Sequence, residues 1–439
     1  ETYSREHDFR LTETMVINAR TVNETRFEFE NNRRESSGDN SIPTVNVASA
    51  FIGGGSQIGL NYNNENSLEL QNYTTTTFGK NSQHAVKFGV RLRSNWIEDR
   101  SESNYGGSFT FSGASAVIDT SDPACQVSDP PASCILAPAV SPIEQYRQKL
   151  LGNTDTRFNP NQFTITSGDP LANVSQTDVG LFIGDDWRIN PGLTLSGGIR
   201  YEYQTNISDN FNFAPRFGFA YSPGAGGARA PKTVFRGGFG IFYDRISDNL
   251  TLNADRFDGL KQFSYIVSNN SPDSTILLSQ PVFTLNGVTN IPSLAQLSPL
   301  SNTIRLLAPN IQAPYTIQSV FSVERQLPAK ITLSASYIGA RTLHQLRARN
   351  INAPVCLDFQ NCNSSTRPDP TSGNIYQYES SGIVNSNRLN VNFRSFLSSN
   401  FSLFGNYSYG LTKSDADGSG SFPAYSYDLN GEYGRASSD

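Results

Sequence analysis

The stretch Thr177–Gln204 reads TDVGLFIGDDWRINPGLTLSGGIRYEYQ, and its alternation decides the fold. In the first arm apolar side chains share one parity and small or polar ones share the other, with Phe182 and Asp185 as the two exceptions. After the turn at Asn190–Gly192 the alternation resumes. Because successive side chains of a strand point to opposite faces, this stretch predicts a hairpin with one apolar and one polar face.

The length of the two arms points to a membrane. Each arm has about a dozen residues, whereas the usual soluble strand has about 5–6. A tilted strand needs about 9–11 residues to cross a bilayer. The aromatic residues lie toward the ends of the apolar face, where the interfacial girdles of a membrane barrel are found. The stretch therefore favours a transmembrane β-hairpin.

The same pattern recurs along the chain, and six hairpins with short turns are predicted. The paired arms are Leu11–Ile17 with Thr25–Glu30, Ser67–Phe78 with Ala85–Ser94, Thr177–Asn190 with Leu193–Gln204, Asn212–Ser222 with Thr233–Tyr243, Thr316–Gln326 with Ile331–Arg341, and Arg388–Phe396 with Phe401–Thr412. The first hairpin is the least regular. Most connections between hairpins are far longer than the usual median of about 4–6 residues. Short turns on one side and long loops on the other are typical of an outer-membrane barrel.

The long connections are Asn31–Asn66, Asn95–Gln176, Asp244–Pro314 and Thr342–Asn387. They are rich in Asn, Ser, Pro and Asp, and we expect them to lie outside the cell. One segment, Pro142–Leu151, has helical spacing and predicts a short helix within a loop.

The basic residues of the predicted strands support a polar lumen. An arginine on the lipid face costs about 2–4 kcal/mol at the midplane, and seven arginines fall on the parity opposite the apolar side chains. These are Arg91, Arg93, Arg200, Arg216, Arg236, Arg388 and Arg394. The candidate lumen-facing charges are Asp178, Asp186, Arg188, Arg200, Glu202, Arg216 and Arg236. They could contact a plug or a substrate path, but a cross-strand ladder of ion pairs is the favoured interpretation.

Composition excludes several classes of protein. Of the 439 residues only 17% are charged, yet 28 are Phe and 19 are Tyr, too aromatic for a disordered chain. No stretch approaches the roughly 18 apolar residues of a membrane-spanning helix. A net charge of −5 with no long basic run gives no sign of nucleic-acid binding.

The four cysteines form two close pairs, each in a polar loop. Cys125 with Cys134 and Cys356 with Cys362 are candidate local disulfides in an oxidising compartment. Free thiols remain the alternative. Zinc is disfavoured, because the spacings lack the CxxC form and no histidine is nearby.

No cofactor, metal site or catalytic arrangement stands out, and we expect no enzymatic activity. Only three histidines occur, far apart in the sequence. Asp415-Ala416-Asp417-Gly418 resembles the start of an EF-hand calcium loop. The twelfth position of such a loop is a bidentate Glu, but here it is Ser426, so a solvated loop without calcium is favoured. Gly237, Gly238 and Gly240 inside a strand indicate either close approach of a plug or loop, or strand curvature.

Several of these segments resemble the barrel strands of TonB-dependent outer-membrane receptors. They are HAVKFGVRLR at His84–Arg93, Leu181–Tyr203, FAPRFGFAYSP at Phe213–Pro223, TVFRGGFGIFYDR at Thr233–Arg245, and YGRASSD at Tyr433–Asp439. The Oar-like branch, whose members carry an N-terminal carboxypeptidase-regulatory-like domain, is the most similar. The resemblance implies a barrel of about 22 strands with a plugged lumen, driven through a TonB box by an inner-membrane complex.

The expected fold is therefore all-β, an antiparallel transmembrane β-barrel with short periplasmic turns and long extracellular loops. The sequence contains about twelve recognisable strands of the 22 that the family resemblance implies. Residues 1–439 are expected to be a fragment of one barrel domain, because no plug domain or TonB box precedes the strands and Asp439 falls in an apparent loop.

The expected function is energised uptake or export of a substrate across the bacterial outer membrane, with lipid, the plug domain and the TonB complex as partners. A passive porin, or a structural or adhesive surface barrel, is the alternative. A soluble secreted β-sandwich or β-solenoid is disfavoured by the sorted loops and the aromatic girdle.

Overall fold

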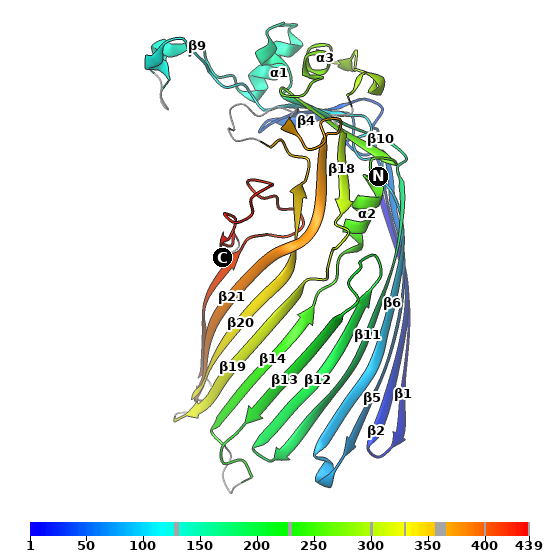
Figure 1. Ribbon diagram of the computed structural model, residues 1–439, viewed down its shortest axis with the longest axis vertical. Helices are drawn as coiled ribbons and strands as arrows, with labels where there is room; N and C mark the ends of the chain where they lie inside the picture. The colour runs from blue at the N-terminus through cyan, green and yellow to red at the C-terminus, as the bar shows by residue number, and fades with distance from the viewer. Residues whose placement is uncertain are drawn as a thin grey trace.

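Twelve long strands stand side by side and form one curved wall (Figure 1). The computed structural model of the protein describes residues 1–126, 131–226, 231–298, 302–328, 331–355, 366–398 and 401–437. Each wall strand pairs antiparallel with the next, from β1 at one edge to β22 at the other. The wall strands are β1 (Thr2–Asn18), β2 (Thr21–Ser37), β5 (Leu60–Phe78), β6 (His84–Arg100), β11 (Leu171–Asn190), β12 (Leu193–Gln204), β13 (Asn212–Tyr221), β14 (Thr233–Tyr243), β19 (Tyr315–Leu327), β20 (Ile331–Asn350), β21 (Asn374–Ser398) and β22 (Phe401–Ser414).

All six predicted hairpins are present, including the irregular first one. Several strands are longer than predicted, since β5 begins at Leu60 rather than Ser67 and β21 at Asn374 rather than Arg388. The added residues are mostly polar on both faces, as in Asn61–Asn66. Alternation marks only the part of a strand that faces lipid, so it could not show these extensions.

The predicted sorting of the connections is confirmed. Short turns close the six hairpins at the lower end of the wall, and the long connections lie at the other end (Figure 1). In outer-membrane barrels the short turns are periplasmic and the long loops extracellular.

The long connections contain more structure than their sequence indicates. The predicted loop helix is present as α1 (Pro142–Leu150), with the hydroxyl of Ser141 accepting a hydrogen bond from the backbone N–H of Glu144. The other helices and strands of the connections are β3 (Thr44–Val47), β4 (Phe51–Gly54), β7 (Ser108–Phe111), β8 (Val117–Ile118), β9 (Ile135–Ala137), β10 (Gln162–Gly168), α2 (Asp248–Arg256), β15 (Gln262–Ser268), α3 (Ser274–Ser279), β16 (Val282–Thr284), β17 (Gly287–Thr289), β18 (Asn302–Leu307) and β23 (Gly434–Arg435).

Three of the long connections meet above the wall (Figure 1), and we call their described residues, 38–59, 101–126, 131–170, 244–298 and 302–314, the extracellular cap. Strand β7 pairs parallel with β3 and antiparallel with β10, and β10 pairs with β15. Phe109, Phe111, Phe163 and Val267 are fully buried at its centre. The apolar side chains of the wall face outward, so a dry core forms in the cap instead.

The two faces of the wall differ as the alternation predicts. Leu181, Ile199 and Phe217 point outward and remain about half exposed, while Asp178, Arg200 and Arg216 take the opposite parity. No helix within the described ranges is long and apolar enough to span a bilayer.

Both exceptions in the opening stretch have a structural explanation. Asp185 faces outward near the periplasmic end, where its Oδ2 lies 2.6 Å from Nδ1 of His84. The His84 ring stacks between Phe78 and Trp187, at centroid distances of 4.9 and 5.4 Å. Phe182 faces inward, with the guanidinium of Arg200 over its ring at 6.0 Å.

Gly237 shows why one strand glycine is needed. A Cβ placed there would overlap the ring of Phe219, its cross-strand partner. At Gly237 the close neighbour is therefore a ring of the adjacent strand on the outer face.

Candidate functional site

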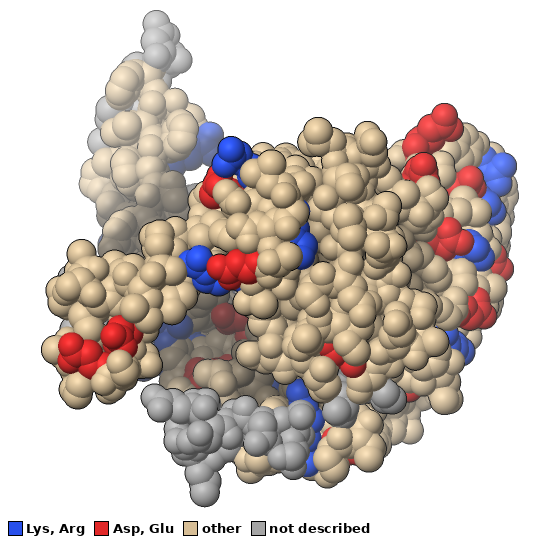
Figure 2. All heavy atoms as spheres, turned by 90° about the horizontal axis from the view of Figure 1, so that it is seen from above, with Lys and Arg blue, Asp and Glu red and all other residues tan. Residues whose placement is uncertain are grey.

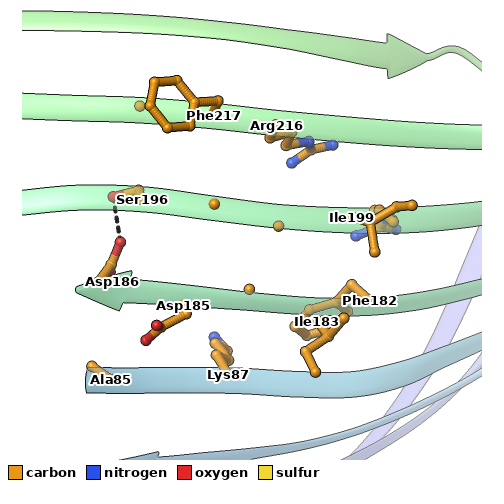
Figure 3. Close-up of a pocket in the computed structure, with 15 residues that line it drawn as sticks. Ala85, Lys87, Phe182, Ile183, Asp185, Asp186, Ser196, Ile199, Arg216 and Phe217 are labelled. Atoms are coloured by element: carbon orange, nitrogen blue, oxygen red, sulfur yellow. Dashed lines mark hydrogen bonds between the residues drawn. The ribbon is translucent and has the colours of Figure 1, made fainter.

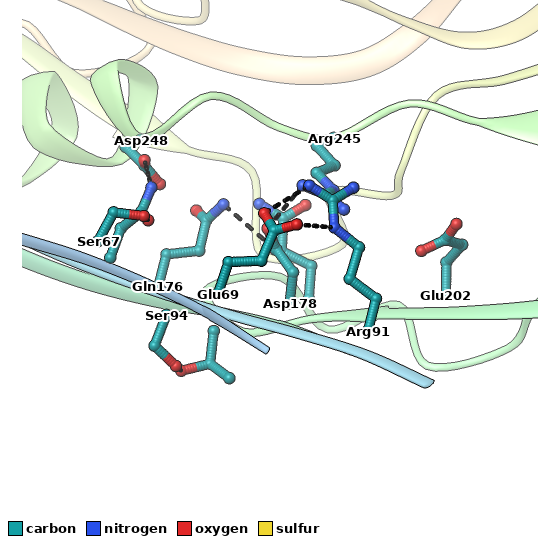
Figure 4. A network of polar contacts seen from close by, with 12 residues as sticks. Ser67, Glu69, Arg91, Ser94, Gln176, Asp178, Glu202, Arg245 and Asp248 are labelled. Carbon is teal, nitrogen blue, oxygen red and sulfur yellow. Dashed lines mark hydrogen bonds and ion pairs between the residues drawn. The ribbon is translucent and has the colours of Figure 1, made fainter. Parts of the chain in front are cut away.

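The inner face of the wall carries a polar network below the cap (Figure 4). Arg91 on β6 binds Glu69 on β5 through two hydrogen bonds, 2.9 Å from Nε to Oε1 and 2.7 Å from Nη2 to Oε2. Asp178 on β11 is 6% exposed, and its Oδ2 lies 3.3 Å from Nη1 of Arg245. Arg245 lies outside the wall strands, so the network joins the wall to the connection that follows β14.

The same connection then turns into the lumen and is held there by two glutamines. The side chain of Gln204 donates to the carbonyl of Ile246 at 2.7 Å and accepts from the Ile246 N–H at 3.1 Å. Gln176 donates to the same carbonyl at 3.4 Å. All three side chains are buried. A buried backbone needs such partners, and the two amides provide them for this segment.

Helix α2 begins directly after this anchor and lies against the inner wall at the mouth (Figure 1). Its first residue, Asp248, accepts a hydrogen bond of 3.1 Å from the side chain of Asn95. At its last residue, the buried Arg256 pairs with Asp99. Between them Leu252 packs against Ala172 and Val174. Both ends and the middle of α2 are therefore fixed to β6 and β11.

Two hollows lie along the inner face of the wall, and one of them adjoins this anchored segment. A polar cavity of about 280 Å³ lies between the wall and the segment, lined by Arg91, Asp178, Arg200, Glu202 and Arg245 among others. A wider hollow of about 490 Å³ lies on the wall nearer the periplasmic end (Figure 3). Its floor includes Gly184, Gly198 and Gly218, and Lys87, Arg200 and Arg216 stand around it. The space inside the wall is thus lined by charged groups of both signs.

The view from above shows the outer surface of the cap (Figure 2). Most of that surface carries no charge, and the acidic and basic side chains lie in small mixed groups. Beside the cap a hollow leads down to charged side chains. A solute reaching the lumen would pass from a largely neutral surface to a strongly polar wall.

Comparison with known proteins decides the family. The outer membrane beta barrel domain matches residues 2–212 and 206–439. The chain belongs to this family. It therefore lies in the bacterial outer membrane, with the apolar face of its wall against lipid.

Solved structures share the fold. The outer membrane transporter YddB from Escherichia coli superposes with a TM-score of 0.56 at 12% identity, covering 94% of this chain and 42% of that one. A mutant of the ferric enterobactin receptor PfeA from Pseudomonas aeruginosa gives a TM-score of 0.52 at 10% identity, covering 94% and 46%. The chain thus spans less than half the length of either protein. No curated protein sequence matches it significantly.

The barrel brings some of the predicted lumen charges together and separates others. Asp178 joins the network at the mouth, and Arg200 pairs with Glu202 on its own strand beside the same cavity. Asp186 accepts a hydrogen bond from the hydroxyl of Ser196. Arg188 lies at the periplasmic end of the same face, opposite Thr194.

The two remaining charges lie farther along the wall. The guanidinium of Arg216 is 4.5 Å from the ring centroid of Phe242, and Arg236 lies 3.3 Å from Glu324.

The favoured cross-strand ladder of ion pairs between β11 and β12 is wrong. The register places Gln204 opposite Asp178, Gly180 opposite Glu202, and Ser196 opposite Asp186. Between these two strands, therefore, no charge faces an opposite charge directly, although Asp178 lies opposite Arg93 on the other neighbour of β11, strand β6. Arg245, the partner of Asp178, comes from another connection instead.

Sequence reasoning missed the two glutamines that hold the lumen segment. Gln176 and Gln204 share the inward parity with Asp178 and lie at the extracellular end of their strands. Two glutamines on the inward face, near the extracellular ends of neighbouring strands, form a sequence pattern that could predict a backbone segment bound in the lumen.

One of the two predicted disulfides lies within the described residues. Cys125 and Cys134 form a disulfide with an S–S distance of 1.95 Å. The second predicted pair, Cys356 and Cys362, lies outside the described residues.

The acidic loop after β22 has a structural role. The two carboxylate oxygens of Asp415 contact the backbone N–H of Ile383 at 2.6 Å and Nη2 of Arg347 at 2.9 Å. Asp417 accepts from the hydroxyl of Ser437 at 2.8 Å. Within the described part of the chain, no three His, Cys, Asp or Glu residues gather as metal ligands would.

Proposed function

We propose that this barrel is part of a TonB-dependent receptor of the Oar-like branch, which moves a substrate across the outer membrane at the expense of energy from the inner membrane. The proposal makes the protein a transporter rather than an enzyme. It requires a plug domain and the TonB complex as partners of the complete protein. The family, the similarity of fold to YddB and PfeA, and the strand motifs at His84–Arg93 and Leu181–Tyr203 support it.

The observation that carries the proposal is the segment folded into the mouth. Helix α2 is anchored to the inner wall at both ends, and the Gln204 amide holds the preceding backbone in a buried position. A passive porin works best with an open path. A barrel whose own connection occupies the mouth has to move that connection for each passage, which suits a driven and selective process.

The first experiment measures passive flux. The complete protein is placed in liposomes, and swelling in small neutral sugars is compared between the unmodified protein and a Gln204→Leu, Asp178→Asn double variant. Removing the partners of buried polar groups costs about 1–3 kcal/mol for each group, so the segment at Arg245 and Ile246 should detach from the wall and flux should rise. Gln318→Leu, a lumen-facing glutamine on β19 away from α2, is the matched control and should leave flux unchanged.

Energy coupling is tested separately by binding of the periplasmic domain of TonB to the complete protein. We expect a transporter of this class to bind it. High sugar flux through the unmodified barrel together with no binding of TonB would favour the passive porin. Low flux with no binding would favour a structural or adhesive barrel.

A further inference from the structure

The outward face of β5 is interrupted by polar residues. Along this strand Leu68 and Leu70 occupy the extracellular side of the band and Phe78 the periplasmic end, but Asn72, Thr74 and Thr76 lie between them. The register fixes the side of the wall, because Asn72 lies opposite Val90, which lies opposite the outward Leu181. The intervening Tyr73 faces inward, with Lys87 over its ring at 4.1 Å.

The interruption continues on the two neighbouring strands. Asn23 lies opposite Thr74, and Thr25 lies opposite Asn72. Glu13 of β1 in turn lies opposite Thr25. These residues form one continuous area, which we call the polar outer patch: Glu13, Thr21, Asn23, Thr25, Asn72, Thr74 and Thr76.

The depth of the patch makes it unusual. Leu68 and Phe78 are ten positions apart, about 33 Å along a strand, which a tilt of about 40° converts to a height of about 25 Å. That equals the height of the apolar band of an outer-membrane barrel, about 25 Å. Asn72 and Thr74 therefore lie near the middle of the band, whereas the corresponding positions on β6 and β11 are Val90, Phe88, Leu181 and Ile183.

Several polar side chains of the patch form hydrogen bonds with one another. The amides of Asn23 and Asn72 exchange hydrogen bonds of 3.2 and 3.1 Å, and Asn72 also donates to the hydroxyl of Thr25 at 2.8 Å. Glu13 differs, because its carboxylate makes no hydrogen bond or ion pair within the described residues. A carboxylate turned toward hydrocarbon is costly, so a donor from outside the chain is expected there.

The surroundings of the patch have a complementary shape. On one side Phe9 and Leu11 present large apolar side chains on the outward face of the edge strand β1, where they lie opposite Phe29 and Phe27. On the other side the outer wall is hollowed, with a volume of about 530 Å³ lined by Asn72, Val90, Leu181, Ile199 and their neighbours. Two copies related by an axis along the membrane normal would bring the projecting side of each against the hollow side of the other.

We propose that the polar outer patch is the centre of an in-membrane contact between two copies of this protein. A two-fold contact needs a self-complementary surface, and asparagine and threonine both donate and accept hydrogen bonds. The hydroxyls of Thr25 and Thr74 accept from the amides within one copy and keep their own O–H groups, which donate to Glu13 of the other copy. The apolar projections fill the hollows. Inside a bilayer such polar side chains join proteins, since lipid offers them no partner. This association is independent of the proposed transport function.

Photo-crosslinking in the bacterial outer membrane tests the proposal. A photo-reactive amino acid replaces Asn72 in the complete protein, and as a matched control it replaces Leu389, an outward residue on β21. We expect at least tenfold more product of twice the monomer mass from the Asn72 position. Equal yields at the two positions, adducts with lipid alone, or an adduct with a different protein would each overturn it.

A substitution series provides the second readout. The variant N23L/N72L/T74V removes the amide pair together with Thr74, whose hydroxyl accepts a hydrogen bond of 2.9 Å from Asn23. Of the hydroxyls that these amides contact, it leaves that of Thr25 without its amide donor. The expected result is a folded barrel, as judged by protease resistance, whose dimer dissociates at least tenfold more readily in detergent. A dimer of unchanged strength would show that the patch is only a polar ladder facing lipid.

Discussion

At the scale of single residues, the barrel pairs its buried charges with partners that are remote in sequence. Arg347 is 2% exposed, and its nearest carboxylate is Asp415, at 2.9 Å, on the connection after β22. Among the described residues, Asp415 is the carboxylate that forms an ion pair with Arg347, so the buried charge depends on it. The pair therefore fastens the last connection to β20.

Replacing Asp415 should loosen this connection strongly. The Asp415→Asn variant leaves the Arg347 charge buried without a counter-charge, which typically costs about 3–5 kcal/mol. Urea unfolding of the complete protein in lipid, together with proteolysis of the 415–436 segment, measures the effect. The neighbouring Asp417→Asn variant serves as control, because Asp417 contacts an exposed serine hydroxyl. Equal behaviour of the two variants would refute the structural role of Arg347 and Asp415.

At the scale of elements, the cap depends on a few polar side chains that join its strands. Tyr105 donates to the carbonyl of Gly168 at the end of β10, at 3.0 Å, and accepts from Gln262 at the start of β15, at 3.0 Å. Burial, aided by the charge of Glu102, raises the pKa of Tyr105 to about 12. The neutral phenol is thus the form that the folded cap prefers.

This raised pKa predicts a loss of cap stability at alkaline pH. A group whose pKa is higher in the folded state contributes its full stability below its unfolded pKa, here about 10, and loses it as the pH approaches 12. Calorimetry between pH 9 and 12 should show the cap transition falling in temperature for the unmodified protein. Tyr105→Phe should lower the transition at pH 9 but make it less dependent on pH. Parallel curves for the two proteins would exclude Tyr105 as the responsible group.

The disulfide between Cys125 and Cys134 joins two residues of the cap that are nine positions apart in sequence. A short loop gains modest stability from closure, about 2–3 kcal/mol at most, and that gain is local. The double variant Cys125→Ser, Cys134→Ser should therefore be cut faster by proteinase K within residues 117–137. The unfolding free energy of the wall should stay the same. A general loss of barrel stability would contradict the local role.

At the scale of the whole molecule, the features that could be predicted from the sequence are those made by residues close together in the chain. The hairpins have a period of two and close through short turns, so local alternation predicted them, and Asp185 broke the pattern only because His84 offers it a partner. The contact of Gln204 with Ile246 joins residues 42 positions apart. Its geometry depends on how the wall curves, and no local pattern contains that. The lumen segment, the cap core and the polar outer patch were missed for the same reason.

The orientation of the wall leads to the last prediction, which uses two adjacent residues of β11. Leu181 faces lipid and Phe182 faces the lumen. An arginine on the lipid face of a barrel costs about 2–4 kcal/mol at the midplane, whereas an arginine in a polar lumen is solvated. Leu181→Arg should therefore lower the unfolding free energy of the complete protein in lipid vesicles by roughly that amount.

Phe182→Arg provides the comparison, because it introduces the same side chain at the same depth on the opposite face. It should cost less than about 1 kcal/mol beyond the loss of the Phe182 contact with Arg200, since lumen substitutions avoid the lipid. Because both variants introduce arginine, the difference between their unfolding free energies measures the effect of the face on which the side chain lies. Equal destabilisation would mean that both faces meet the same medium, which is incompatible with a membrane barrel around a polar lumen.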